Sequence, residues 1–161
     1  MTSIQNTTTG GRASTVLGLA FLGALVIPAL VFLLVGLIEG MSANELLGAL
    51  RAQYVSGKQN LLVLGLVGCL PLALLALVVW ILGRIKRIST SRRRFSMGGA
   101  FAILLVLLWV NFEYWPTFLP HRTYAGFPHG LEFVIGPFVF APVAMVFGLL
   151  LAAFWPRRAA T

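Results

Sequence analysis

Two histidines and four glutamates are the residues with the clearest capacity for chemistry in this chain. His121 and His129 lie in a proline-rich stretch between Glu113 and Glu132, and imidazole with carboxylate is a ligand set that zinc or copper accepts. The histidines are eight positions apart in a segment whose prolines prevent a long helix, so their spacing does not show that they converge. These four residues are candidate metal ligands. The alternative is two histidines that hydrogen-bond to backbone or lipid headgroups.

Glu113 and Asn111 are candidates for an ion or proton site. Glu113 comes before the third apolar segment has clearly ended, and an ionisable group inside a membrane span is costly, so it suggests a function. If the helix starts near Met97, Glu113 lies about one turn below the membrane surface. The alternative is an ion pair with Arg122 or a hydrogen bond to Asn111.

Other kinds of catalytic site lack the residues they require. The chain has no Asp, and Cys69 is its single cysteine, which excludes an intramolecular disulfide and a cysteine-based zinc or redox pair. Both histidines fall outside the apolar segments, so no axial pair is available for a haem inside a bundle. The phosphate-binding patterns GxxxxGK[ST] and GxGxxG are absent. We therefore expect no cofactor, and the sequence favours a non-enzymatic protein.

The composition places these residues in a membrane protein. Of 161 residues, 59% are hydrophobic and 10% are charged, against roughly 25% charged in an ordinary soluble domain. Crossing a bilayer takes about 20 mostly apolar residues, and the chain has such segments at about 14–38, 61–82, 97–115 and 133–155. We predict an all-α integral membrane protein. Its single membrane domain covers residues 14–158, with tails at 1–13 and 159–161.

The positive charges gather on one side of these segments. The N-terminal tail, the connection between segments two and three, and the C-terminal tail hold nine basic residues and no acidic side chain: Arg12, Arg84, Lys86, Arg87, Arg92, Arg93, Arg94, Arg157 and Arg158. The other two connections hold three basic residues and all four glutamates. Loops rich in Lys and Arg stay in the cytoplasm, so both termini are expected there. The arginine-rich composition is typical of a bacterial inner membrane protein.

The connection between segments two and three is a candidate lipid-binding segment. It holds six basic residues within eleven positions: Arg84, Lys86, Arg87, Arg92, Arg93 and Arg94. Anionic lipid headgroups are the expected partners, and each basic residue near the surface contributes on the order of 1 kcal/mol. The alternative is that these charges only set the orientation. No aromatic stacking platform accompanies them, so nucleic acid is not expected as a partner.

The first outer connection is predicted to contain a short amphipathic helix. Ser42 and Glu45 have the spacing of a capping box. Apolar residues such as Leu46 and Tyr54 then recur at helical spacing, and Gly57 is a candidate helix stop. We expect this helix to lie on the outer surface of the membrane. A gate or a docking face for a partner is the alternative.

Small residues at intervals of four mark candidate helix-packing faces. They are Ala144, Gly148 and Ala152 in the fourth segment, and Gly36 and Gly40 at the outer end of the first. Such stripes let two helices approach closely. They suit a neighbouring helix of the same chain and a partner subunit equally well.

Few polar residues fall within the apolar segments, which leaves little for a solute pathway or for chemistry inside a bundle. The sequence therefore favours a non-enzymatic subunit, assembly factor or regulator of a larger membrane complex, whose partners are other membrane proteins or copies of itself. One alternative is an oligomeric transporter or channel with Glu113 and Asn111 facing a shared water-filled axis. Another is a membrane enzyme or metal-binding protein that uses the second outer connection.

Overall fold

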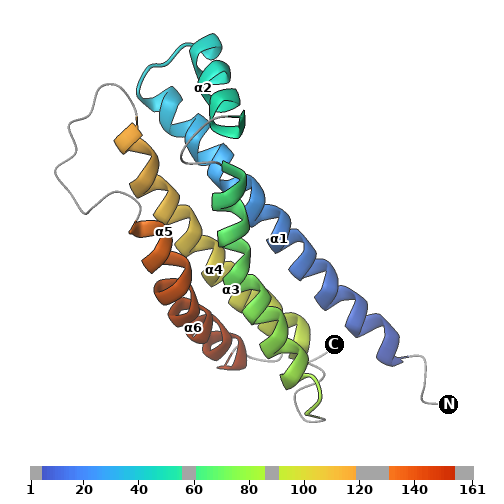
Figure 1. Ribbon diagram of the computed structural model, residues 1–161. Helices are drawn as coiled ribbons and strands as arrows, with labels where there is room; N and C mark the ends of the chain where they lie inside the picture. The colour runs from blue at the N-terminus through green and yellow to red at the C-terminus, as the bar shows by residue number, and fades with distance from the viewer. Residues whose placement is uncertain (1–4, 56–60, 86–90, 119–130, 155–161) are drawn as a thin grey trace.

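The chain folds into a helical bundle with four candidate membrane spans (Figure 1). A computed structural model describes residues 5–55, 61–85, 91–118 and 131–154. Within these ranges, the helices are α1 (Gln5–Ile38), α2 (Ala43–Val55), α3 (Leu61–Leu82), α4 (Arg92–Tyr114), η2 (Trp115–Phe118), α5 (Glu132–Ile135), η3 (Gly136–Phe140) and α6 (Ala141–Phe154). The predicted all-α class and the four apolar spans are confirmed.

Two helices begin before the apolar segments predicted from sequence, although the first span itself, Ala13–Ile38, agrees with its predicted start. Helix α1 starts at Gln5, well before residue 14, and α4 starts at Arg92, before the predicted start near Met97. Hydropathy marks where apolar residues begin, but arginine is itself a good helix former. Its long side chain can also leave the apolar region while its backbone stays helical. The first turn of α4 is therefore made of arginines that the sequence analysis places in a connection.

The fourth span is interrupted by a wide turn. Helices α5 and α6 flank the π-helical η3, in which the Ala141 N–H donates to the Gly136 carbonyl five residues earlier. Pro142 follows at once, and in a regular helix its ring would crowd the carbonyl four residues before it. A π turn is one way in which a helix relieves such a conflict. Gly136 is buried against Val110, in a place where a side chain would overlap that valine.

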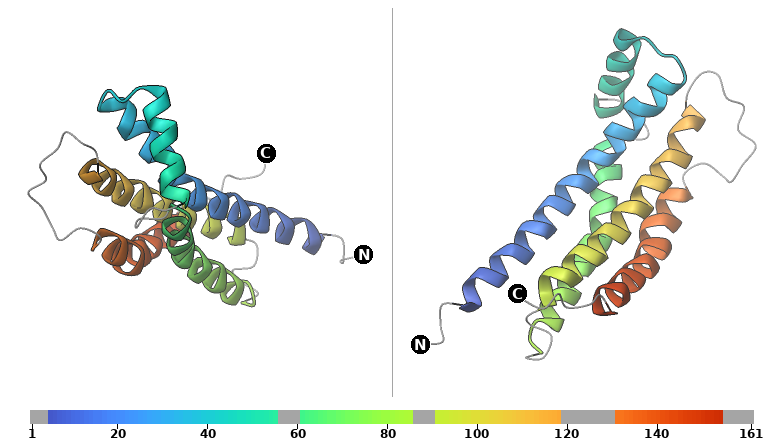
Figure 2. Two further views of the ribbon diagram at one scale, coloured as in Figure 1. Left: turned by 45° about the horizontal axis from the view of Figure 1, so that its top comes forward. Right: turned by 180° about the vertical axis from the view of Figure 1, so that it is seen from behind.

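Helix α4 lies at the centre of the bundle (Figure 2). It packs extensively against both α1 and α6, and less extensively against α3, which also lies along α1. Helix α6 lies at the margin, because α4 is its main neighbour. Any interaction that holds α6 in the bundle must therefore act mainly through α4.

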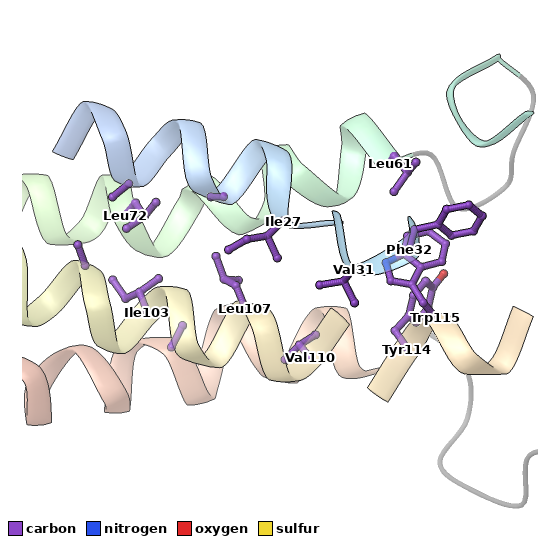
Figure 3. Packing of buried hydrophobic residues seen from close by; sticks show 14 of the residues in the cluster. Ile27, Val31, Phe32, Leu61, Leu72, Ile103, Leu107, Val110, Tyr114 and Trp115 are labelled. Atoms are coloured by element: carbon purple, nitrogen blue, oxygen red, sulfur yellow. The ribbon is translucent and has the colours of Figure 1, made fainter. Parts of the chain in front are cut away.

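The interior is filled by branched apolar side chains (Figure 3). Leu72, Leu75 and Ile103 have no exposed surface, and Leu107 and Val110 are almost fully buried. Gly99 leaves room for the Leu75 side chain at the contact between α3 and α4. Lipid tails are as apolar as leucine, so between membrane helices it is van der Waals packing that makes such contacts favourable.

The predicted helix in the first connection is confirmed, together with its capping box. The Ser42 hydroxyl and backbone N–H donate to Glu45 Oε2 at 2.7 and 2.9 Å. The Glu45 N–H donates back to the Ser42 hydroxyl oxygen at 3.4 Å. This exchange satisfies backbone donors that the start of α2 would otherwise leave without partners.

Helix α1 ends at Ile38, and Gly40 lies in the turn immediately before this box. Gly40 has a φ of 81°, a conformation that glycine adopts without strain. Its N–H donates to the Leu37 carbonyl, and the Met41 N–H donates to the Gly36 carbonyl, which is the hydrogen-bond pattern of a Schellman motif. The structure thus gives Gly40 a place in the turn between α1 and α2, with no atom near its Cβ position, and not in a helix-packing stripe.

We expect α2 to loosen when the solution is acidified. The Ser42 hydroxyl, and then its backbone N–H, hydrogen-bond to Glu45 and lower the pKa of that carboxyl below its ordinary value. The stability that this carboxylate contributes is present above the pKa of the unfolded chain, and it is lost as pH falls through the lowered pKa of the folded chain. Carbon NMR of the Glu45 carboxyl group in bicelles would follow both the protonation of Glu45 and the loosening of α2.

The matched variant is Glu45→Gln, which keeps an acceptor in the capping box but does not titrate. Its α2 should hold the same helicity across the acidic range. If the wild type and this variant lose helicity at the same pH, then Glu45 is not the group responsible.

Candidate functional site

The buried polar side chains described in the structure are Ser96 and Asn111, and both are hydrogen-bonded within or next to α4. The Ser96 hydroxyl donates to the Arg92 carbonyl at 3.0 Å. Asn111, only 2% exposed, donates from Nδ2 to the Leu107 carbonyl at 2.8 Å. Its Oδ1 accepts the indole N–H of Trp115 at 3.1 Å. A buried amide that has such partners stabilises the fold, whereas an unpaired one would destabilise it.

Trp115 joins this amide to an aromatic cluster (Figure 3). The indole has no exposed surface. Its ring contacts Phe32 of α1 edge to face at 5.0 Å and Tyr114 at 5.1 Å. Aromatic pairs in this arrangement add about 0.5–1.5 kcal/mol beyond their burial. We call Phe32, Asn111, Tyr114 and Trp115 the aromatic cluster; it fastens the end of α4 and the start of η2 to α1.

Glu113 and Asn111 lie on different faces of α4. Asn111 faces the interior, and Glu113 is exposed. Two positions along a helix turn a side chain through about 200°, so residues i and i+2 do not face each other. Glu113 instead continues an exposed face that includes Trp109 and Phe112. The structure does not bring the two candidates for an ion or proton site together.

The candidate metal ligands can be placed only in part. His121 and His129 lie outside the described residues, as does Arg122, the proposed ion-pair partner of Glu113. Glu132 is the first residue of α5, and only its backbone is described. Within the ranges that the structure describes, no three His, Cys, Asp or Glu residues come together. The metal hypothesis therefore stays a prediction.

The small residues of α6 lie against small residues of α4. A Cβ atom on Gly98 would come within 2.5 Å of the Gly148 carbonyl oxygen and 3.0 Å of the Ala152 Cβ. A Cβ atom on Gly148 would overlap the Gly98 backbone and come within 3.0 Å of the Ala102 Cβ. The two backbones therefore meet directly. The sequence analysis names Gly148 and Ala152 but misses Gly98 and Ala102, although their own spacing of four is the signal for such a contact.

The other candidate packing residues have different surroundings. Ala144 is half-buried on α6, on the same side as Gly148. Gly36 is buried, and a Cβ atom there would overlap the Leu46 side chain of α2. Gly36 thus makes room for the short helix, whereas Gly148 makes room for a membrane span.

Four described arginines lie where α3 ends and α4 begins, whereas Arg51 lies on α2. The Arg84 guanidinium lies over the Trp80 ring at 3.9 Å from its centroid, a cation–π contact. The Arg92 guanidinium lies against Gly83, and its Nε is buried without a hydrogen-bond partner. Arg93 is exposed and Arg94 half-buried. Lys86 and Arg87 lie outside the described residues.

No family model, curated protein or solved structure was found to match this chain.

Proposed function

We propose that this four-span membrane protein is a non-enzymatic subunit, assembly factor or regulator of a larger membrane complex. The observation that carries the proposal is the packed interior. Its central side chains are apolar, and the two buried polar residues of the described ranges, Ser96 and Asn111, are hydrogen-bonded within or next to α4. Such an interior suits a structural role better than a solute pathway, which requires polar groups facing a shared cavity.

Two further features favour association with other membrane chains. Helix α6 is held almost entirely by α4, so most of its surface faces outward. Asn111 is buried inside a single chain, so it is not on a surface that several copies of the chain could share. The partners that we propose are other membrane subunits or further copies of this chain, and nucleic acid is not among them.

We also propose that the protein resides in a bacterial inner membrane with both termini in the cytoplasm. The charges support this orientation. The end of α3 and the start of α4 lie at one end of the bundle, and α2 and the end of α4 at the other (Figure 1). The first end carries Arg84 and Arg92–Arg94, and the second carries Glu39, Glu45 and Glu113 beside Arg51. Positive residues in short loops stay in the cytoplasm, where the leaflet is rich in anionic lipids. In this orientation α2 lies at the outer surface.

The proposal predicts a stoichiometric partner. The tagged chain would be purified from its own host in native nanodiscs, with mass spectrometry of every chain and elemental analysis of the same fraction. We expect a second membrane protein in fixed ratio, whose own amount in the membrane falls when this chain is deleted. Phe147→Ala, on the exposed face of α6, is a variant that can weaken such an association without disturbing the interior.

Two results would contradict the proposal. A homo-oligomer that conducts ions in vesicles, and loses conduction in Glu113→Gln without loss of folding, would support the transporter alternative. Stoichiometric zinc or copper that disappears in His121→Ala would support the metal-binding alternative.

A further inference from the structure

Arg84 and Arg92, at the junction of α3 and α4, lie far along the chain from every acidic side chain. The chain contains four glutamates and no aspartate. Glu39 follows α1, Glu45 lies in α2, Glu113 lies near the end of α4, and Glu132 starts α5. Helix α2 and the end of α4 lie at the opposite end of the bundle from the α3–α4 junction (Figure 1). A carboxylate counter-ion from a described side chain is therefore not available to these guanidinium groups.

The Arg92 side chain nevertheless has a defined position. Its guanidinium group lies against Gly83, in the turn that ends α3, and a Cβ atom at residue 83 would overlap Nε, Cζ and Nη2. The Nε atom is buried, and no described residue accepts its hydrogen. Packing against glycine thus holds the planar group in place, and because Nε is enclosed, a ligand has to bind through the Nη groups. Planar guanidinium groups in fixed positions are well suited to bind phosphate.

Arg84, the residue after Gly83, is also held in a defined position. Its backbone N–H donates to the Ile81 carbonyl at 3.0 Å, which continues the turn, and its guanidinium group lies over Trp80. Trp80 is 53% exposed, as expected of a tryptophan at the level of lipid headgroups. On the same side of α3 as Trp80, Leu77 and Ile81 are exposed apolar residues, along which acyl chains can lie.

The first turn of α4 makes a bound anion at this junction still more favourable. Arg92 and its two neighbours lie where the helix dipole is positive, and this turn contains no acidic residue. Cations are unfavourable at that end of a helix, and anions are favourable. The side chain of Ser91, at the N-cap, makes no capping hydrogen bond.

We propose that Trp80, Gly83, Arg84 and Arg92, called the headgroup site below, bind the phosphate group of an anionic phospholipid whose acyl chains lie along α3. The two fixed guanidinium groups supply the charge, and Trp80 sets the depth. This inference deepens the proposed function, from which it takes only the anionic cytoplasmic leaflet as the source of the ligand. The headgroup site differs from a general attraction between basic residues and anionic lipids, because binding at this site depends on the position of the Arg92 guanidinium group.

The test uses the full chain in nanodiscs of phosphatidylcholine with a minority of phosphatidylglycerol, and native mass spectrometry counts the phosphatidylglycerol retained on the protein. Gly83→Ala changes no charge but displaces the Arg92 guanidinium, so we expect retention to weaken by about fivefold. Arg92→Gln should weaken it equally. Arg93→Gln removes the same charge from an exposed neighbour and should change retention by less than about twofold.

Two outcomes would overturn the inference. If Gly83→Ala retains phosphatidylglycerol like the wild type while Arg92→Gln and Arg93→Gln weaken retention equally, the attraction is diffuse. If inorganic phosphate alone displaces the lipid, the ligand is a soluble phosphate and not a lipid. Circular dichroism checks folding, and Gly83→Ala decides the matter by itself if Arg92→Gln fails to fold. The purified chain needs no partner protein in this experiment, so the result is independent of the co-purification test.

Discussion

Replacing Gly148 with leucine is expected to separate α6 from α4 and to lower the free energy of unfolding by about 3 kcal/mol. The reason is the direct backbone contact at Gly98, where even a single added carbon has no room. Because α4 is the main neighbour of α6, no other helix can compensate. Unfolding in mixed micelles of increasing denaturing detergent, followed by circular dichroism, measures the loss.

Gly18→Leu is the matched control. It adds the same side chain to a membrane span at a position where no atom lies within 4 Å of the Cβ position. This variant should unfold within about 0.5 kcal/mol of the wild type. Equal effects of the two substitutions would show that α4 and α6 do not meet at Gly148.

The second large effect is expected in the aromatic cluster. Trp115→Ala removes the largest fully buried side chain of the described residues, leaves a cavity beside Phe32 and deprives Asn111 of its donor. Core truncations of this size cost about 3–5 kcal/mol. The free energy of unfolding in mixed micelles should fall accordingly, and the end of α4 should loosen from α1. Hydrogen exchange of the amides near Trp115 would detect that local change.

Two further variants separate packing from hydrogen bonding. Trp115→Phe keeps a ring in the cluster but leaves the Asn111 oxygen without its donor, at a cost of about 1–3 kcal/mol. In the background of Asn111→Leu the same substitution should cost less, because no buried acceptor remains. Trp109→Ala is the control, since that ring is 51% exposed and its described ring contact is with Phe140. If Trp109→Ala and Trp115→Ala have equal effects, the cluster has no special role.

The spans and the capping box could be predicted from sequence because both depend on residues close together in the chain. A length of apolar residues predicts a membrane helix, and the spacing of Ser42 and Glu45 predicts a capping box. The bond between Asn111 and Trp115 was also within reach, since residues four apart share a helix face. The predicted partners of Asn111 are instead Glu113 and a water-filled axis, because the third segment is expected to end at about residue 115.

Other features depend on how separate helices meet. The small residues of α6 predict a close neighbour, but only the structure shows that the neighbour is α4. The π turn at Gly136–Phe140 could not be inferred from Pro142, since a proline in a span is equally compatible with a kink. The contact between Arg92 and Gly83 joins the start of α4 to the turn after α3. The number and positions of the charges in the sequence do not predict this contact.

The separation of charge along the bundle couples the protein to the voltage across its membrane. Arg84 and Arg92–Arg94 lie where α3 ends and α4 begins, whereas Glu39, Glu45 and Glu113 lie at or near the ends of α1, α2 and α4 that face the other way, beside Arg51. An inside-negative potential lowers the energy of each positive charge on the inner side by about 2.3 kcal/mol per 100 mV, relative to the outer side. In the proposed orientation, the electric field across an energised membrane therefore acts on the bundle as on an oriented dipole. Dissipating that field during insertion should leave a larger fraction of chains inverted.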